Sequence, residues 1–394
     1  ERCRFRTCYD TRILPLQLSA LEYCVQGEHA LMSLRLDMSA GGNFSECELD
    51  QLRLHLAGDR YISQGLYLSL LRELEGIELR PLDCDGRAVS AADGKPLLMR
   101  LDAEQVKPVG FAEEHALMPY PHTTFSGYRH LQEYFSFPEK YLFVDVNGLD
   151  VLQPLPQDQL TQICSIQVCF TLRVGCQTTE CPTLSNVKLY CTPIVNLFKH
   201  DAVPIRLDGK QDEYLLIPGE YARENACVFS VDKVMGWRPG GLGYQAYVPF
   251  ETFEHDGDID ASAPPTSYSI RQRASAHHTG LDTWLTFGNG QVHAQETLSI
   301  ELTCTNHNLP RQLQAGDINQ PCEQTPEGLS FRNICAPTAS FAPPLDQDFL
   351  WRLISNMSLN YLSLTDINAF KVLLQTYDVP RYHDRHAQKV SQRR

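Results

Sequence analysis

Hydrophobic positions alternate with polar or small ones in two stretches of the first third of the chain. Alternation runs from Met32 to Met38 and again from Leu52 to Leu56, where Gly58-Asp59 follows. This pattern predicts strands with one buried face. Leucine or isoleucine then recurs at every fourth position and predicts a helix from about Tyr61 to Glu75.

A second short helix is predicted around Tyr128–Phe135. Its apolar members Tyr128, Leu131 and Phe135 fall on one face, which we expect to be buried, and Pro138 ends the helix. The segment from Tyr141 to Val146 then reads as a strand. On this interpretation Phe135→Ala damages stability.

The pattern from residue 160 to 305 is dominated by strands. Gly, Pro and Asp turns separate short β-runs, which is typical of a sandwich or barrel. The predicted strands are Ile163–Val174, Val187–Cys191, Tyr214–Ile217, Val228–Val231, Tyr244–Phe250 and Leu298–Cys304.

Two helices are predicted near the end of the chain. Asp346 is placed to cap the first, and the second starts near Thr365 or Asp366 and ends by Pro380. The predicted fold class is therefore α+β and β-rich, with β-sandwich or barrel-like domains, short helices and a helical C-terminal segment.

The same pattern predicts three parts of the chain. These are a mixed α/β domain over 1–112, a β-rich domain opened by a short helix over 113–345, and a helical segment over 346–394. Proline-bearing stretches at Pro108–Pro121 and Pro337–Pro344 are the expected linkers, since proline cannot donate to a sheet ladder.

The composition favours an ordered protein that binds neither nucleic acid nor a membrane. Hydrophobic residues make up 43% of 394 residues, and the formal net charge is −14. An acidic chain repels phosphate backbones and anionic lipid, so no nucleic acid partner is expected. No apolar run approaches the roughly 18 residues of a membrane helix, so no direct membrane insertion is expected. The chain opens on Glu1-Arg2-Cys3, and we expect it to be a fragment.

The fourteen cysteines sit mostly inside apolar runs, where free cysteine behaves as a small hydrophobe. We therefore predict reduced thiols and a cytoplasmic location. Cys164, Cys169, Cys176 and Cys181 are spaced more widely than the usual zinc pairs, so no metal is predicted.

Other candidate chemistry is weak. Asp256–Asp260 resembles the start of a calcium loop, but Ala261 stands where glycine is needed. Gly240–Gly243 lacks a dinucleotide frame, and His277-His278 are isolated neighbours. Glu133 and Glu139 are two carboxylates that an acid–base pair would need, but structural roles are expected for both. Glu133 is expected on the polar side of its helix, and Glu139 is expected to cap the turn or pair with Lys140. No catalytic, cofactor or metal residue is predicted, and the chain is not expected to be an enzyme.

One segment carries a resemblance to a known family. Tyr120–Leu149 contains Phe-Ser-Gly-Tyr-Arg-His-Leu-Gln-Glu-Tyr-Phe-Ser-Phe-Pro-Glu-Lys, which resembles the signature of the TssF (ImpG/VasA) family of type VI secretion baseplate subunits. Further matches are Cys191–Phe198, Cys304–Asn306 with Leu309-Pro310, and Leu359–Leu364. The signature positions, to which only a structural role is given, are Gly127, Tyr128, Glu133, Phe135, Phe137, Pro138, Glu139, Asn196, Asn306, Pro310 and Asn360.

The resemblance implies a scaffold without cofactors. Two TssF copies would assemble with TssG, TssE and TssK in a wedge around the VgrG spike. Such wedges would nucleate the contractile sheath, as in phage-tail baseplates, on the cytoplasmic side of the inner-membrane complex. The copies would occupy different environments, so we expect rigid domains whose relative placement differs between them.

A carbohydrate-active or carbohydrate-binding β-sandwich protein is the alternative. The 17 Tyr, 17 Phe and 3 Trp could supply sugar-stacking platforms. Such a protein would present two carboxylates about 5–10 Å apart across a groove, or an exposed aromatic platform.

Overall fold

The computed structural model describes eleven stretches of the chain. They are residues 2–40, 42–91, 94–120, 126–173, 181–237, 243–250, 266–276, 280–287, 296–341, 347–358 and 367–379. The chain divides into two compact units, one formed by Thr7–Pro193 and the other by Glu1–Arg6 with Ile194–Arg394.

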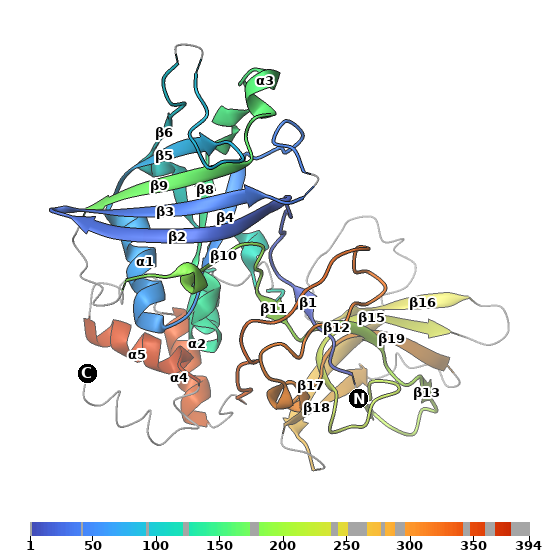
Figure 1. Cartoon of the computed structure of the whole chain (residues 1–394). Coiled ribbons are helices and arrows are strands. Elements are labelled where there is room, and N and C mark those ends of the chain that lie inside the picture. Colours follow the sequence, from blue (N-terminus) through green and yellow to red (C-terminus); the bar gives the residue numbers. More distant parts are fainter. Residues whose placement is uncertain are drawn as a thin grey trace, which may run out of the picture. The chain divides into compact units, whose positions relative to one another are not determined.

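Two antiparallel sheets build the unit Thr7–Pro193 (Figure 1). The first has the order β2 (Leu16–Gln26), β3 (His29–Met38), β9 (Ser165–Arg173), β5 (Leu74–Leu82) and β6 (Met99–Asp102). The second has the order β10 (Val187–Lys188), β4 (Gln51–Leu56), β8 (Phe143–Asn147) and β7 (Val106–Pro108).

The core of this unit lies between the two sheets and helix α1 (Arg60–Arg72). Alternate residues of β3 and β4 point inward, including Leu34, Leu36, Leu54 and Leu56, all of which are 0% exposed. This confirms the strands that alternation predicted over 32–38 and 52–56. The side chain of Asp59 accepts from the Tyr61 N–H and caps α1, which ends at Arg72 because β5 starts at Leu74.

A disulfide joins Cys84 and Cys164 in this unit. Leu82 at the end of β5 pairs with Ser165 at the start of β9, so the residues just beyond these positions lie side by side. The prediction that all cysteines are reduced is wrong for this pair. The eleven other cysteines in the described stretches form no disulfide with a described residue.

The other unit is built on an eight-stranded sheet. Its order is β12 (Phe198–Asp201), β19 (Glu296–Thr305), β15 (Cys227–Trp237), β16 (Tyr244–Pro249), β17 (Ser267–Ala274), β18 (Leu281–Phe287) and β14 (Glu213–Leu215), with β13 (Ile205–Leu207) pairing with β19. β16 and β17 pair in parallel and the other pairs are antiparallel. Two irregularities in β15 change its register against β19, and the inner face packs Val234, Tyr247, Leu298 and Ile300.

Short elements complete the two units. β1 (Arg6–Thr7) pairs with β11 (Ile194–Val195). The helices are α2 (Ser126–Ser136), α3 (Gln157–Leu160), α4 (Gln347–Ser358) and α5 (Ile367–Tyr377). The short 3-10 turns are η1 (Ala103–Gln105), η2 (Glu113–His115), η3 (Pro138–Tyr141), η4 (Leu149–Leu152), η5 (Leu184–Asn186) and η6 (Leu309–Gln312).

The chain is thus a β-rich α+β protein with several sheets, one of them curled as half a barrel, and a few short helices (Figure 1).

Some sequence boundaries differ from the structure. The segment 138–141 is a 3-10 turn, so the strand expected from Tyr141 begins at Phe143. The long edge strand β2 was not predicted, because its Leu-Ser-Ala-Leu run breaks the alternation and a bulge lies between Leu18 and Ala20.

The predicted boundary at residue 112 lies inside the unit Thr7–Pro193, while the chain passes between units at 6/7 and 193/194. The three-part division of the sequence stays a prediction.

Candidate functional site

The signature segment folds back on itself as a helix and a 3-10 turn. α2 ends when the Phe137 N–H donates to the Glu133 carbonyl at 2.7 Å. Pro138 then opens η3, where its fixed φ suits the first helical position. The Lys140 N–H donates to the Phe137 carbonyl at 3.2 Å, so Lys140 returns toward the helix it has just left.

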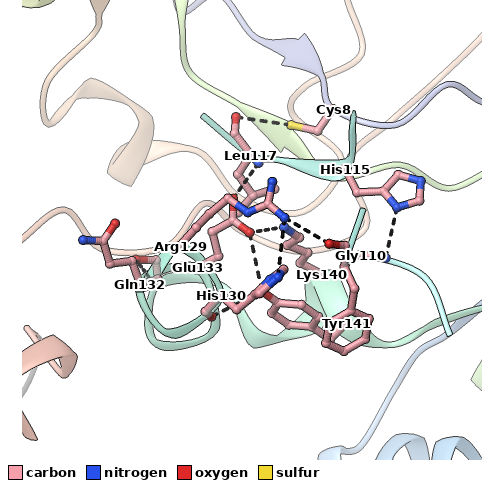
Figure 2. A network of polar contacts seen from close by, with 12 residues as sticks. Cys8, Gly110, His115, Leu117, Arg129, His130, Gln132, Glu133, Lys140 and Tyr141 are labelled. Carbon is pink, nitrogen blue, oxygen red and sulfur yellow. Dashed lines mark hydrogen bonds and ion pairs between the residues drawn. The ribbon is translucent and has the colours of Figure 1, made fainter. Parts of the chain in front are cut away.

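A fully buried ion pair closes this fold. Glu133 is 1% exposed and Lys140 is 0% exposed, and the Lys140 Nζ donates to Glu133 Oε2. The other carboxylate oxygen, Oε1, accepts from the Leu117 N–H at 2.8 Å. Figure 2 shows Glu133 at the centre, reached by Lys140 from η3 and by Leu117 from the preceding loop. A buried carboxylate is tolerated only when it is paired in this way.

Arg129 lies one helical turn before Glu133 and is 5% exposed. Its guanidinium donates to the carbonyls of Phe111 at 3.0 Å, Ala112 at 3.2 Å and Glu113 at 3.3 Å. Three carbonyls of one loop are therefore tied to α2. Within the expected linker Pro108–Pro121, the stretch 111–117 is held inside its unit by these bonds and by the bond from Leu117.

Tyr9 and Tyr141 enclose the pair. The Tyr9 hydroxyl donates to the Lys140 carbonyl at 3.0 Å, and the Tyr141 hydroxyl lies 3.4 Å from Glu133 Oε2. Gly110 passes close beside them with a φ of +105°, and a Cβ there would lie 3.1 Å from the Tyr9 hydroxyl. Only glycine adopts this backbone conformation without strain. We call Glu133, Lys140, Arg129, Tyr9 and Tyr141 the buried charge cluster.

Burial sets the protonation of the buried charge cluster. It lowers the pKa of Lys140 below that of a free lysine, while the Glu133 carboxylate opposes the shift. It raises the pKa of both Tyr9 and Tyr141, which keeps these phenols neutral. Burial also lowers the pKa of His130, which is therefore neutral at pH 7. Both oxygens of the Glu133 carboxylate accept from buried donors, so the arrangement fixes the shape of this turn.

The structure reverses the predicted faces of α2. The prediction that Glu133 lies on the polar, solvated side is wrong, because Glu133 and Arg129 form the buried stripe. Tyr128, Leu131 and Phe135 are only half-buried. Of the two roles expected for Glu139, the pairing with Lys140 is not found, since Lys140 pairs with Glu133 and Glu139 is exposed in the first turn of η3. Gly127, Phe137 and Pro138 are half-buried around the same turn.

Two other signature residues meet in the second unit. The Asn306 N–H donates to Asn196 Oδ1 at 2.6 Å, and Asn196 Nδ2 donates to Asn306 Oδ1 at 2.9 Å. Both side chains also bond to the backbone of Arg4. Asn306 is 0% exposed, and Pro310 is buried in η6 shortly after it. Asn360 lies outside the described residues.

The remaining candidates lie only in part within the described residues. Cys164 is in the disulfide and Cys176 lies outside the described residues, so the zinc set is not assembled. The calcium-like segment, Gly240–Leu242 and the His277-His278 pair also lie outside them. Within the described stretches, no three His, Cys, Asp or Glu side chains are grouped to hold a metal.

One open groove of about 460 Å³ is lined by two carboxylates, Asp10 and Asp50. Asp50 forms an ion pair with Arg12 at 2.9 Å. The groove thus offers no free pair of carboxylates of the kind a glycosidase needs.

Sequence reasoning missed the importance of Arg129 and Lys140. A signal was present, because Arg129 and Glu133 are four residues apart and so share one helix face. Charged residues are rarely buried unless they are paired, so the sequence alone predicts that this face is solvated. The partner, Lys140, lies beyond a proline turn whose geometry the helical pattern does not describe.

Comparison with known proteins identifies the family. The family profile described as "Type VI secretion system, TssF" matches residues 1–392. The chain belongs to the TssF family. TssF is a structural, non-enzymatic baseplate family of the type VI secretion system.

Two relatives show the extent of the similarity. The type VI secretion system component TssF1 of Pseudomonas aeruginosa is 26% identical over 409 residues, which cover 95% of this chain. This chain spans 63% of the length of that relative. A chain in the cryo-electron microscopy structure of a TssK–TssF–TssG baseplate subcomplex is 29% identical, with a TM-score of 0.77. That match covers 96% of this chain and 67% of the other.

In this chain, the segment that carries the resemblance supplies Arg129, Glu133, Lys140 and Tyr141 of the buried charge cluster. In the described part of the chain, no helix is both long and apolar enough to cross a bilayer.

Proposed function

We propose that this chain is a structural subunit of the type VI secretion baseplate wedge. It assembles with TssG, TssK and TssE and with a second TssF copy. The wedges surround the VgrG spike and start the contractile sheath. The observation that carries the proposal is the similarity over 96% of the chain to a chain of the TssK–TssF–TssG subcomplex.

The construction of the molecule supports a role in shape. Residues of the signature segment form hydrogen bonds within the chain, as in the Glu133–Lys140 pair and the Arg129 contacts. The Asn196–Asn306 exchange does the same in the other unit. We propose that the signature positions act as packing and turn determinants in both units. We also propose that the sheets form sandwich or barrel-like domains and that the C-terminal segment is helical.

We propose a cytoplasmic location, at a baseplate docked on the inner-membrane complex. Eleven of the thirteen described cysteines form no disulfide with a described residue, which fits a reducing compartment, and the Cys84–Cys164 bond is the exception. No cofactor and no nucleic acid is required for such a role.

Co-purification tests the proposal. The chain carries an affinity tag, is co-expressed with TssG, TssK and TssE of the same gene cluster, and the eluate is weighed by native mass spectrometry. We expect a complex that contains two copies of this chain for one TssG. Recovery of the tagged chain alone, at concentrations where the other subunits bind one another, would contradict the proposal.

A further inference from the structure

Three aromatic rings form a row on the outside of the buried charge cluster. The ring centroid of Tyr141 lies 5.1 Å from that of Phe111 and 6.3 Å from that of Tyr134. Tyr141 is 9% exposed, whereas Phe111 is 50% and Tyr134 is 44% exposed. His130 adds a fourth ring, 5.5 Å from Phe111. We call Phe111, Tyr134, Tyr141 and His130 the aromatic row.

The buried charge cluster holds the aromatic row in place. Arg129 fixes the Phe111 carbonyl, and Glu133 fixes Lys140, the residue before Tyr141. Tyr134 follows Glu133 directly on α2. Rings held by a rigid frame lose little side-chain entropy on binding, which favours their use as contact residues.

Acidic residues flank the aromatic row. Glu113 and Glu114 follow Phe111 in η2, and Glu139 lies two residues before Tyr141 in η3. All three side chains are exposed, and none forms a salt bridge with a described residue. Together with Glu133 they make four carboxylates, against the two cations Arg129 and Lys140, so the surroundings of the aromatic row carry a net negative charge.

We infer that the aromatic row is a docking surface for a basic segment of another baseplate subunit, with an Arg or Lys side chain lying against the rings of Phe111 and Tyr134. A cation within about 6 Å of a ring centroid is attracted by the negative face of the ring. The flanking carboxylates supply charge-assisted hydrogen bonds to the same cation. This inference rests on the proposed function.

Charge excludes the other occupants. A second copy of this chain that used the same surface would bring its own Glu113, Glu114 and Glu139 against these three, and like charges placed together are unfavourable. An anionic lipid surface or a nucleic acid would meet the same repulsion. A purely apolar helix would leave the three carboxylates without partners at its edge.

Photo-crosslinking in the assembled complex tests the inference. p-Benzoylphenylalanine is placed at Phe111 and, as a control, at Tyr61 of α1, which is 55% exposed. On irradiation, position 111 is expected to cross-link to a peptide of another subunit that contains several Lys or Arg residues. A cross-link only to acidic or uncharged peptides, or to a second copy of this chain, would overturn the inference.

Variants measure the contribution of each feature. Phe111→Ser with Tyr134→Ser, and separately Glu113→Gln with Glu114→Gln, are expected to weaken association with the other subunits by at least about tenfold. The effect of the glutamine pair should vanish near 1 M salt, where the Debye length is about 3 Å, while that of the serine pair should persist. Tyr61→Ser and Glu46→Gln are the matched controls, and unfolding curves verify that each variant is folded.

The outcomes separate the two proposals. If the unaltered chain fails to assemble with TssG, TssK and TssE, the proposed function is wrong. If the unaltered chain assembles and both folded variant pairs assemble with the same affinity, the function stands and the docking surface is wrong.

Discussion

At the residue scale, the buried charged side chains are the groups whose effect on stability is largest to test. Lys140 is 0% exposed, and the nearest compensating charge is the Glu133 carboxylate. Bringing both ions into the interior costs free energy that their attraction only partly returns. Their contribution is therefore best measured by removing one partner and then both.

Lys140→Met should lower the free energy of unfolding by about 3–5 kcal/mol, because it leaves Glu133 buried without a cation. Lys140→Met combined with Glu133→Gln should recover most of that loss, since the glutamine oxygen still accepts from the Leu117 N–H. Urea unfolding of the four proteins completes a double-mutant cycle. A double variant as unstable as the single one would show that the ion pair does not account for the loss.

His55 should make stability depend on pH. It is 7% exposed, stacks on Phe143 at 4.3 Å, and burial lowers its pKa to about 4 from an ordinary value of 6.5. Between these values the unfolded chain takes up a proton that the folded chain refuses, so stability falls as pH drops from 6.5 to 4. The loss is about 3 kcal/mol at pH 4.

Denaturant unfolding at pH 7.0, 5.5 and 4.5 measures this slope. In His55→Phe, the free energy of unfolding should fall less steeply with falling pH over this range, by the contribution of one histidine. Equal slopes in the two proteins would mean that His55 is not the titrating group.

At the element scale, α2 shows why a helix face cannot be assigned from apolarity alone. The face with Tyr128, Leu131 and Phe135 is half-buried, while the face with Arg129 and Glu133 is covered by η3 and by the loop at 111–117. The elements that pack over α2 therefore decide which of its faces is buried, and the hydrophobic pattern along the helix does not.

Phe135→Ala should therefore cost less than the 3–5 kcal/mol typical of a fully buried phenylalanine, and about 1–2 kcal/mol is expected. Val144→Ala in the core strand β8, where the side chain is 0% exposed, provides a buried comparison within the same unit. Unfolding curves of both variants test the point. A loss above 3 kcal/mol for Phe135→Ala would indicate that this face is covered more fully than the described residues show.

The disulfide joins the ends of two neighbouring strands. It closes a loop with a sequence separation of 80 residues, for which chain-entropy arguments give about 4 kcal/mol of stabilisation. Dithiothreitol should lower the free energy of unfolding of the unaltered chain by that order. Cys84→Ser should show no response to the reductant. An unaltered chain that carries two extra free thiols on native labelling would lack the bond.

At the scale of the whole molecule, the chain is two compact units that meet in sequence at 6/7 and 193/194. Packed interiors resist continuous deformation, whereas connections between units can adjust. The stretch 108–120 does not serve as a connection between them, because Arg129 and Glu133 hold it within one unit.

In an assembled wedge with two copies of this chain, each unit should superpose closely between the copies, while the whole chain superposes less well. A reconstruction of the wedge that resolves both copies provides the measurement. Whole chains that overlay as closely as the separate units would show a single rigid body.

The sequence by itself determined the strands with strict alternation, the β-rich α+β class, the short helices and the family. Alternation over Met32–Met38 and Leu52–Leu56 is a local consequence of the pleat, so it needs no knowledge of distant residues. Tertiary structure decided which partner each charge and each thiol would take. Glu133 met Lys140 across a proline turn, Asn196 met Asn306 from 110 residues away, and Cys84 met Cys164 through strand register. Such pairings depend on where the backbone brings two side chains together in space, and no local periodicity encodes that.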